Sequence, residues 1–306
     1  MALERNPDIK LVELKIRKTE LDIEQRFIDI RESKLKALGK RFALLELENQ
    51  RDDIIDTVEY DVQERYYNAK LSRIRYQIAL EDLRYTKSYW QEAIMNYKDG
   101  KIDEESFEET QEEYRSKEEE LVLSEGDHKR SGLMLLLAIN TSLSNSVRLT
   151  DSIQANYKAL DFAYARGNFR IDNRQIRQAR LKYRLKRLEY KIIDKEVESK
   201  NDIRRAKFDY REAKIELEQT TRKQVVELWS RYLRVKELEA NRLVARKRMD
   251  RRKQTYGKNL NRFKQGYIAK NTRDRSVITY RRERYNYLKV VKDLNLAKLR
   301  YFALLR

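Results

Sequence analysis

The chain has 306 residues and a formal net charge of +18; 39% of its residues are charged and only one is proline. Its 40% hydrophobic content excludes a disordered chain, which lacks the apolar residues needed to offset chain entropy. The absence of cysteine excludes disulfides and thiolate sites. Glu, Lys, Arg and Leu dominate over strand-favouring residues, which predicts an all-α chain of long helices that each bury one stripe.

The charge is divided unevenly along the chain. Residues 1–150 carry 32 Asp/Glu and 25 Lys/Arg, a net charge of −7, so residues 151–306 carry +25. A basic half is typical of proteins that bind nucleic acid or an anionic membrane surface. Two halves that pack against each other would show the same pattern. No nucleic-acid recognition module accompanies the charge, so a nucleic-acid partner is not expected.

The first half of the chain predicts three helices. The first covers roughly 8–37 and ends at Gly39, because glycine just past a helix is a common C-terminal cap. The second covers about 41–97, where Ile55, Val58 and Val62 begin a stripe with spacings of three and four residues, typical of coiled-coil-like packing. The third covers about 103–140.

The second half predicts the same arrangement. Its helices cover roughly 171–198, 203–262 and 270–305, with a break at "SKND" (199–202) where Asn201 or Asp202 caps the next helix. A shift of 166 residues superposes "ERYY" (64–67) on "SRYL" (230–233) and Gly100 on Gly266. We therefore expect two tandem repeats of antiparallel helical hairpins, residues 1–145 and 146–306, joined by a loop at "NTSLSNS" (140–146).

Two glycine turns reverse these hairpins at matching places. Each combines an aromatic residue, a lysine, a glycine and an isoleucine. The glycine alone is enough to end a helix, so the other three residues call for a further explanation. We expect both tips to be exposed and to bind a partner through Tyr97, Lys98, Asp99, Gly100, Lys101 and Ile102 in the first and Phe263, Lys264, Gln265, Gly266, Tyr267 and Ile268 in the second.

Charged segments provide two further candidates. The segment 103–120 is strongly acidic and its counterpart 269–289 strongly basic, which fits either solvated faces or hairpins that alternate in an assembly and set its register. A dense basic cluster between 242 and 253 is a possible site for an anionic surface or polymer, composed of Arg242, Arg246, Lys247, Arg248, Arg251, Arg252 and Lys253.

The sequence shows no pattern typical of an enzyme or of a membrane-spanning helix. The single histidine, His128, is expected to be exposed and solvated, and no catalytic set, metal site or phosphate loop is recognisable, so no cofactor is expected. The longest apolar run, "LMLLLAI" (133–139), is far shorter than the roughly 20 residues of a membrane-spanning helix. The N-terminal sequence shows no signal-peptide pattern.

Four phrases together resemble the TolC-type outer-membrane efflux channels. "ALERNPDIKLVELKIRKTELDI" (2–23) resembles that family's first helix, "VQERYYNAKLSRIRYQIALEDL" (62–83) its long helix, and "ALDFAYARGNFRI" (159–171) the start of its second repeat. "NYKDGKI" (96–102) and "RFKQGYI" (262–268) resemble its hairpin tips. The resemblance covers nearly the whole chain.

The resemblance implies a trimeric α-barrel in the cell envelope, on the periplasmic or extracytoplasmic side, whose tips meet the hairpin of a membrane-fusion adaptor. The family inserts a pair of membrane-spanning strands between the first and second helices of each repeat. Here the corresponding stretches, "KALGKRF" and "ESKND", read as tight turns. A natural relative without the strands and a chain from which they were deleted both fit.

Two functions follow from this reading. The first is a non-enzymatic tunnel subunit for efflux or secretion. The alternative is an elongated coiled-coil scaffold that binds an anionic membrane surface or polymer through its basic second half.

Overall fold

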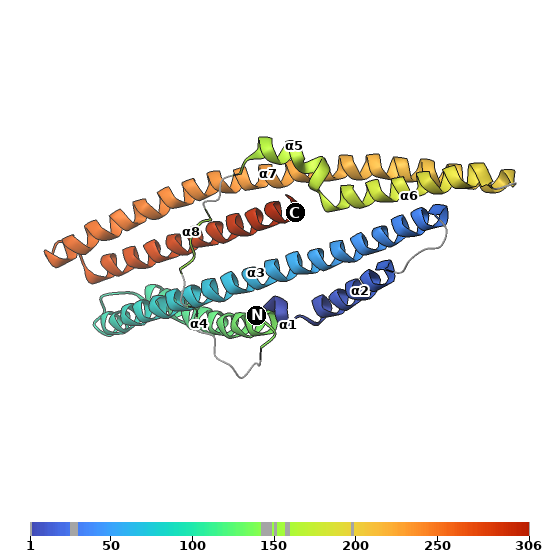
Figure 1. Cartoon of the computed structure of the whole chain (residues 1–306). Helices are drawn as coiled ribbons and strands as arrows, with labels where there is room; N and C mark the ends of the chain where they lie inside the picture. The colour runs from blue at the N-terminus through green and yellow to red at the C-terminus, as the bar shows by residue number, and fades with distance from the viewer. Residues whose placement is uncertain are drawn as a thin grey trace. The chain divides into compact units, whose positions relative to one another are not determined.

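We analysed a computed structural model of the chain, which describes residues 2–24, 30–141, 149, 152–156, 160–196 and 199–305. Every regular element in these ranges is a helix, which confirms the predicted all-α class (Figure 1). The helices are α1 (Ala2–Arg5), α2 (Pro7–Glu24), α3 (Ile30–Lys98), α4 (Glu104–Ala138), α5 (Phe162–Asp172), α6 (Arg174–Glu196), α7 (Lys200–Lys264) and α8 (Lys270–Leu305). At about 1.5 Å per residue, the 69 residues of α3 extend for roughly 100 Å.

The contacts divide the chain into two compact units, and each contains parts of both predicted repeats. Unit 1 consists of Met1–Tyr60, Tyr157–Val235 and Ala297–Arg306. Unit 2 consists of Asp61–Asn156 and Lys236–Leu296. The division of the chain into repeats at residue 145 remains a prediction from the sequence.

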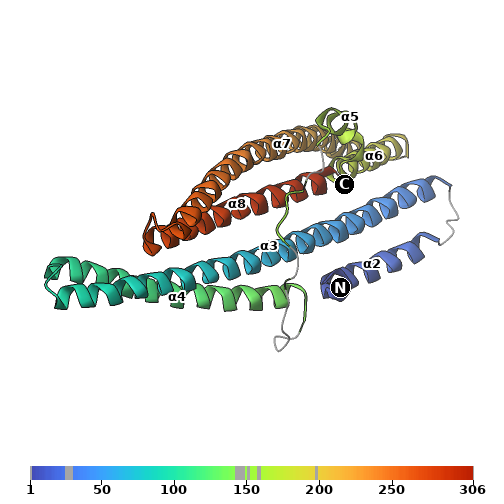
Figure 2. The ribbon, with the colours of Figure 1, turned by 90° about the vertical axis from the view of Figure 1, so that its left-hand side faces the viewer.

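Unit 2 contains two antiparallel hairpins that pack through their inner helices. In the α3/α4 hairpin, the ring of Trp90 stacks on that of Tyr114, with 4.8 Å between centroids. In the α7/α8 hairpin, Tyr256 stacks on Tyr280 at 6.1 Å. Between the hairpins, α3 contacts α8, so the helix order across the unit is α4, α3, α8, α7 (Figure 2).

The segment 152–156 is held against α3 and α8 in the same unit. Ile153 and Ala155 join a buried apolar cluster with Leu71, Leu288 and Val291. The side chain of Asn295 accepts a hydrogen bond from the Asn156 N–H at 2.7 Å and donates to the Gln154 carbonyl at 2.8 Å and the Tyr67 hydroxyl at 3.0 Å. Two buried apolar side chains and one buried amide thus fix this segment between the two hairpins.

Unit 1 has its own core, built from short apolar stripes. On α2, Ile9, Val12 and Ile16 are buried at helical spacings of three and four residues. Phe162 of α5 lies 4.3 Å, centroid to centroid, from both Trp229 and Tyr232 of α7. These aromatic side chains hold the short helix α5 on the long helix α7.

Three predicted helix boundaries are wrong. The first helix ends at Glu24, and Gly39 lies inside α3 instead of capping a helix. Asn201 and Asp202 also lie within a helix, because α7 already begins at Lys200, and the Ile203 N–H reaches back to the Ser199 carbonyl at 3.2 Å. The predicted helix at 171–198 is interrupted at Asn173, between α5 and α6. Residues 142–146 of the predicted joint lie outside the described residues.

Two alanine substitutions are expected to change stability in opposite directions. Gly39→Ala should raise the free energy of unfolding by about 0.5–1 kcal/mol, because Gly39 is helical and a Cβ there meets nothing within 4 Å. Gly100→Ala should lower it by roughly 1–2 kcal/mol, because its φ of +67° disfavours any L side chain. Urea unfolding of both variants measures the difference; a change of the same sign would refute the assignment of Gly39 to a helix.

Candidate functional site: the two hairpin tips

Both predicted tips are helix ends closed by the same backbone turn. The Gly100 N–H donates to the Tyr97 carbonyl at 3.0 Å, and the Lys101 N–H donates to the Asn96 carbonyl at 2.8 Å. At the second tip, the Gly266 N–H donates to Phe263 at 3.0 Å and the Tyr267 N–H to Arg262 at 2.9 Å. This pair of bonds is the Schellman motif, which needs a left-handed residue, and φ is +67° at Gly100 and +76° at Gly266.

A ring contact braces each tip at equivalent positions. Tyr97 stacks on Phe107 with 4.9 Å between ring centroids. Residues 166 positions later, Phe263 and Arg273, form a cation–π contact, with the guanidinium carbon 4.5 Å from the ring centroid. Trp90–Tyr114 and Tyr256–Tyr280 are separated by the same 166 positions. The predicted repeat therefore extends to the side-chain contacts of the two hairpins.

The tip side chains are mostly exposed, as predicted. Lys98, Asp99, Gly100 and Lys101 are exposed at the first tip, and Lys264, Gln265, Gly266 and Tyr267 at the second. Tyr267 reaches 72% exposure, which is unusual for an aromatic side chain without a ligand. Tyr97, Ile102, Phe263 and Ile268 contribute further apolar surface, the last three being half-buried. Each tip thus combines an apolar knob with charged neighbours.

The tips differ in charge. At the first, Asp103 caps α4 by accepting a hydrogen bond from the Ser106 N–H at 3.0 Å, and the hydrogen bonds from Ser106 hold the pKa of Asp103 below its usual value. Asp99 accepts a hydrogen bond from Lys101 at 2.8 Å. The second tip has Ala269 in place of Asp103, and its α7 ends with Arg262 and Lys264. Residues 97–103 of the first tip carry two lysines and two aspartates and are neutral, whereas the equivalent residues 263–269 carry only Lys264 and are basic.

Both tips lie at the same end of unit 2. Contacts between α3 and α8 run in opposite chain directions: Tyr67 pairs with Asn295, and Tyr85 pairs with Arg275. The start of α8, which follows Gly266, therefore lies beside the end of α3, which precedes Gly100. Both views of the ribbon show this arrangement (Figures 1 and 2).

A ladder of ion pairs joins the two hairpins below the tips. Arg281 pairs with Glu81, and Arg282 pairs with Asp82, whose side chain is only 9% exposed. The Nζ of Lys117 on α4 lies 3.6 Å from the same Asp82 carboxylate. Charge-assisted bonds to a carboxylate with so little exposure fix register as well as adding stability. Within the chain, acidic groups of the first hairpin thus meet basic groups of the second.

The basic cluster of α7 lies on the surface of unit 2. Arg246, Lys247, Arg248, Arg251, Arg252 and Lys253 are exposed, and Arg242 is half-buried. Arg246 has an ion pair with Asp250 at 3.8 Å. The cluster is therefore exposed to solvent, and its binding to an anionic surface or polymer stays a prediction.

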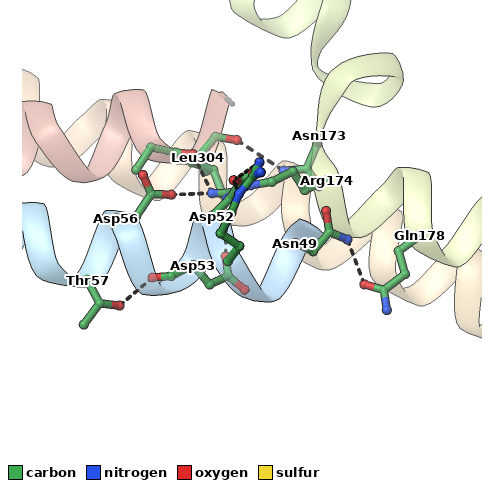
Figure 3. A network of polar contacts seen from close by, with 11 residues as sticks. Asn49, Asp52, Asp53, Asp56, Thr57, Asn173, Arg174, Gln178 and Leu304 are labelled. Carbon is green, nitrogen blue, oxygen red and sulfur yellow. Dashed lines mark hydrogen bonds and ion pairs between the residues drawn. The ribbon is translucent and has the colours of Figure 1, made fainter. Parts of the chain in front are cut away.

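A second polar cluster, which the sequence analysis missed, lies in unit 1 around Arg174 (Figure 3). Its guanidinium pairs with Asp56 and lies 3.7 Å from Asp52 and 3.6 Å from Asp53, all on α3. It also donates to the Ala303 carbonyl at 3.4 Å, near the end of α8. The side chain of Arg174 is 12% exposed, so one cation links three helices.

Asn173 positions Arg174 at the start of α6. Its side-chain oxygen accepts a hydrogen bond from the Ile176 N–H at 3.1 Å, and its amide donates to the Leu304 carbonyl at 3.2 Å. Asparagine is a preferred N-cap, so the "DNRQ" sequence at 172–175 was the available signal. A cavity of about 420 Å³ opens beside the cluster and is lined by Asp53, Asp56, Arg174 and Gln224, among others.

Burial raises the pKa of Asp53; Arg174 opposes the rise, and Asp56 and Asp52 add to it. Arg174 therefore favours the charged form of Asp53 against burial and its two acidic neighbours. Within the described ranges, no group of His, Asp or Glu side chains is arranged to hold a metal ion.

His128 is not exposed as predicted: it is partly buried, and its ring stacks on that of Tyr76 with 5.9 Å between centroids. None of the described helices is long and apolar enough to cross a membrane.

Solved structures with the same fold include several outer-membrane channels. No protein-family model and no curated protein matches the sequence. A membrane protein from Pseudomonas aeruginosa superposes with a TM-score of 0.74 at 10% identity, over 100% of this chain and 91% of its own. The Campylobacter jejuni CmeC outer membrane channel gives 0.72 at 10% identity, over 99% and 84%.

The open state of the Neisseria gonorrhoeae MtrE outer membrane channel gives a TM-score of 0.68 at 12% identity, over 99% of this chain and 87% of that chain. At such identities the likeness concerns the fold. It extends over essentially the whole chain and includes the paired hairpins that the sequence predicted. By its fold, the chain resembles the TolC-type outer-membrane efflux channels.

Proposed function

We propose that this protein is a non-enzymatic subunit of a helical tunnel for efflux or secretion in the cell envelope. The observation that carries the proposal is the pair of equivalent tips at one end of unit 2, on a fold shared with outer-membrane channels. Three copies close the tunnel, each contributing two hairpins. The tunnel lies on the periplasmic or extracytoplasmic side and conducts its substrate without chemistry.

Assembly in solution tests the tunnel. Native mass spectrometry of the purified chain is expected to show a species of three 37.1-kDa subunits, and negative-stain images to show rings with a central opening. A dimer that binds anionic vesicles through the basic cluster would instead support a membrane-surface scaffold. A monomer without vesicle binding would contradict both functions.

We further assign the two tips as the contact for the helical hairpin of a membrane-fusion adaptor. Exposed Tyr267, the ring contacts at both tips and their charged side chains support this assignment, because a partner hairpin has apolar and charged groups to pair with.

A double variant with Gly100→Val and Gly266→Val is expected to weaken binding to an immobilised adaptor hairpin by at least about tenfold, roughly 1.4 kcal/mol. A β-branched residue cannot adopt the positive φ of either turn without strain. Gly132→Ala is the matched control, because Gly132 is helical and a Cβ there has open space. Unchanged affinity in the double variant would exclude the tips as the docking site.

A further inference from the structure

The cavity beside Arg174 is formed by one unit of a single chain. Its volume is about 420 Å³, and every residue that lines it belongs to unit 1. The lining comes from α3, α6, α7 and α8, with Asn173 between α5 and α6. Binding sites for small molecules have volumes of roughly 300–1,000 Å³ and a few polar groups that orient the ligand. The cavity therefore has the size of a small-molecule site, and its polar groups indicate the ligand.

One end of the cavity has a carboxylate with unused acceptors. The Asp53 side chain is 65% exposed and lies 3.6 Å from the Arg174 Nη1. Arg174 pairs more closely with Asp56. The Asp53 carboxylate accepts no hydrogen bond from the part of the chain that the structure describes. Burial and two neighbouring carboxylates also raise the pKa of Asp53. An ammonium group of a ligand would pair with Asp53 and oppose that rise.

A buried amide lies close to this carboxylate. Gln224 of α7 is 4% exposed and lines the cavity, as does Gln175, which follows Arg174 directly on α6. The Gln224 amide donates to the Gln175 side-chain oxygen at 2.5 Å, but the Gln224 Oε1 has no hydrogen-bond partner within the described ranges. A buried carbonyl oxygen without a donor costs free energy, so a ligand N–H that reaches Gln224 would be favoured.

The other end of the cavity has a cation without an acidic partner. Arg300 of α8 is exposed, and its guanidinium carbon lies 4.0 Å from the centroid of the Tyr60 ring. No carboxylate in the described ranges pairs with Arg300. The neighbouring Arg231 is already paired with Glu227 at 2.7 Å and donates to the Arg300 carbonyl at 2.5 Å. The ring contact holds the Arg300 side chain in place but leaves its charge available to an anion.

The two ends are separated by about two helical turns. Asp53 and Tyr60 are seven positions apart on α3, which corresponds to roughly 10 Å. Gln224 and Arg231 are also seven positions apart on α7, one beside each end. An extended peptide covers about 3.3–3.6 Å per residue. Two or three residues therefore bridge the distance between Asp53 and the side chain of Arg300, whereas a single amino acid does not.

We propose that this cavity binds a peptide of two or three residues with free ends, its ammonium at Asp53 and its carboxylate at Arg300. A peptide N–H donates to the Gln224 Oε1, and the apolar surface of Leu299 and Leu304 contacts the small side chains. This site goes beyond the tunnel function and does not depend on it, because a single chain supplies every group.

Isothermal titration calorimetry of the full chain with trialanine tests the site. We expect one trialanine to bind per chain. N-acetyl-trialanine lacks the ammonium and trialanine amide lacks the carboxylate, so each should bind at least about tenfold more weakly. Free alanine has both charges but is too short to reach both ends, and it should also bind at least about tenfold more weakly.

Two variants test the two ends separately. Arg300→Met should weaken trialanine binding by at least about tenfold but leave the affinity for trialanine amide unchanged, because the amide has no carboxylate to lose. Asp53→Asn should weaken trialanine binding in the same way and leave the affinity for N-acetyl-trialanine unchanged. Arg284→Met is the matched control, since it removes an exposed arginine of α8 that does not line the cavity. It should bind trialanine as the wild type does.

The titrations can also refute the site. If trialanine does not bind at millimolar concentration, or if all three peptides bind equally, the cavity is not a peptide site. If Arg300→Met weakens trialanine and trialanine amide by the same factor, the arginine acts on the shape of the cavity, and the assignment of the carboxylate is wrong. The tunnel is tested by assembly, so its failure and the failure of this site are distinguishable.

Discussion

Arg174→Met is expected to lower the free energy of unfolding by about 3 kcal/mol at pH 7. The substitution removes the cation that Asp52, Asp53 and Asp56 share, and a carboxylate left in a poorly solvated place without its partner is strongly destabilising. It also removes the bond from α6 to the Ala303 carbonyl of α8. Urea unfolding followed by circular dichroism measures the loss.

The loss should depend on pH in a defined direction. Without Arg174, nothing opposes the burial and the neighbouring carboxylates that raise the folded-state pKa of Asp53 above its unfolded value of about 3.9. The folded state then binds more protons than the unfolded state, so its stability falls as pH rises through this range. The variant should therefore recover part of its stability between pH 7 and pH 4, relative to the wild type.

The control is Arg184→Met, which removes an exposed arginine from the same helix. It should change the stability by less than about 0.5 kcal/mol. Adding Asp56→Asn to the Arg174 variant should restore part of the loss, because one of the repelling charges is gone. A loss independent of pH would show that the cluster acts through packing and not through charge.

Asn295→Ala is expected to lower the free energy of unfolding by about 2–3 kcal/mol. The Asn295 side chain makes three hydrogen bonds in a buried position, and its loss leaves the Asn156 N–H and the Gln154 carbonyl without their partner. The Asn156 amide should also exchange its hydrogen faster, because segment 152–156 loses its attachment to α8.

The matched control is Asn286→Ala, the same change on the exposed face of α8. Asn295→Asp should have an intermediate effect, since a carboxylate still accepts from Asn156 but cannot donate to Gln154 or Tyr67. If Asn295→Ala and Asn286→Ala were equally mild, the buried amide would not be what holds the segment.

The features that the sequence predicted well have local causes. Gly100 and Gly266 each follow a long apolar stripe and precede a new helix, so a left-handed turn is the simple reading, and the structure confirms it. The predicted end of the third helix near residue 140 also agrees with the end of α4 at Ala138, just before the Asn- and Ser-rich segment.

The wrong helix boundaries lie at residues whose type occurs both inside helices and at their ends. Its sequence context predicts Gly39 as a helix end, but a glycine costs only about 1 kcal/mol inside a helix, and α3 continues through it because its neighbours favour helix. The predicted helix at 171–198 includes Asn173, whereas in the structure Asn173 caps α6. Its cap of α6 has a local signal in "DNRQ", but its hydrogen bond to the Leu304 carbonyl, 131 positions away, has none.

The candidate site divides in the same way. The tips could be found from sequence because each is a contiguous motif. The Arg174 cluster could not, because its aspartates lie on α3, its arginine on α6 and its carbonyl partner on α8. The sequence does not distinguish the buried Arg174 from the many exposed arginines of the basic second half.

The contact between α3 and α8 has a consequence for the order of folding. Glu81 and Arg281 are 200 positions apart, as are Asp82 and Arg282, whereas the rings that brace each hairpin lie close together in sequence. Closing a short loop costs less entropy, so each hairpin should form before the two associate. During synthesis the first hairpin is complete before α8 has been made, so the face of α3 that contacts α8 is exposed to solvent for that time. Because Glu81 and Asp82 are acidic, this part of the face stays hydrated and resists premature aggregation.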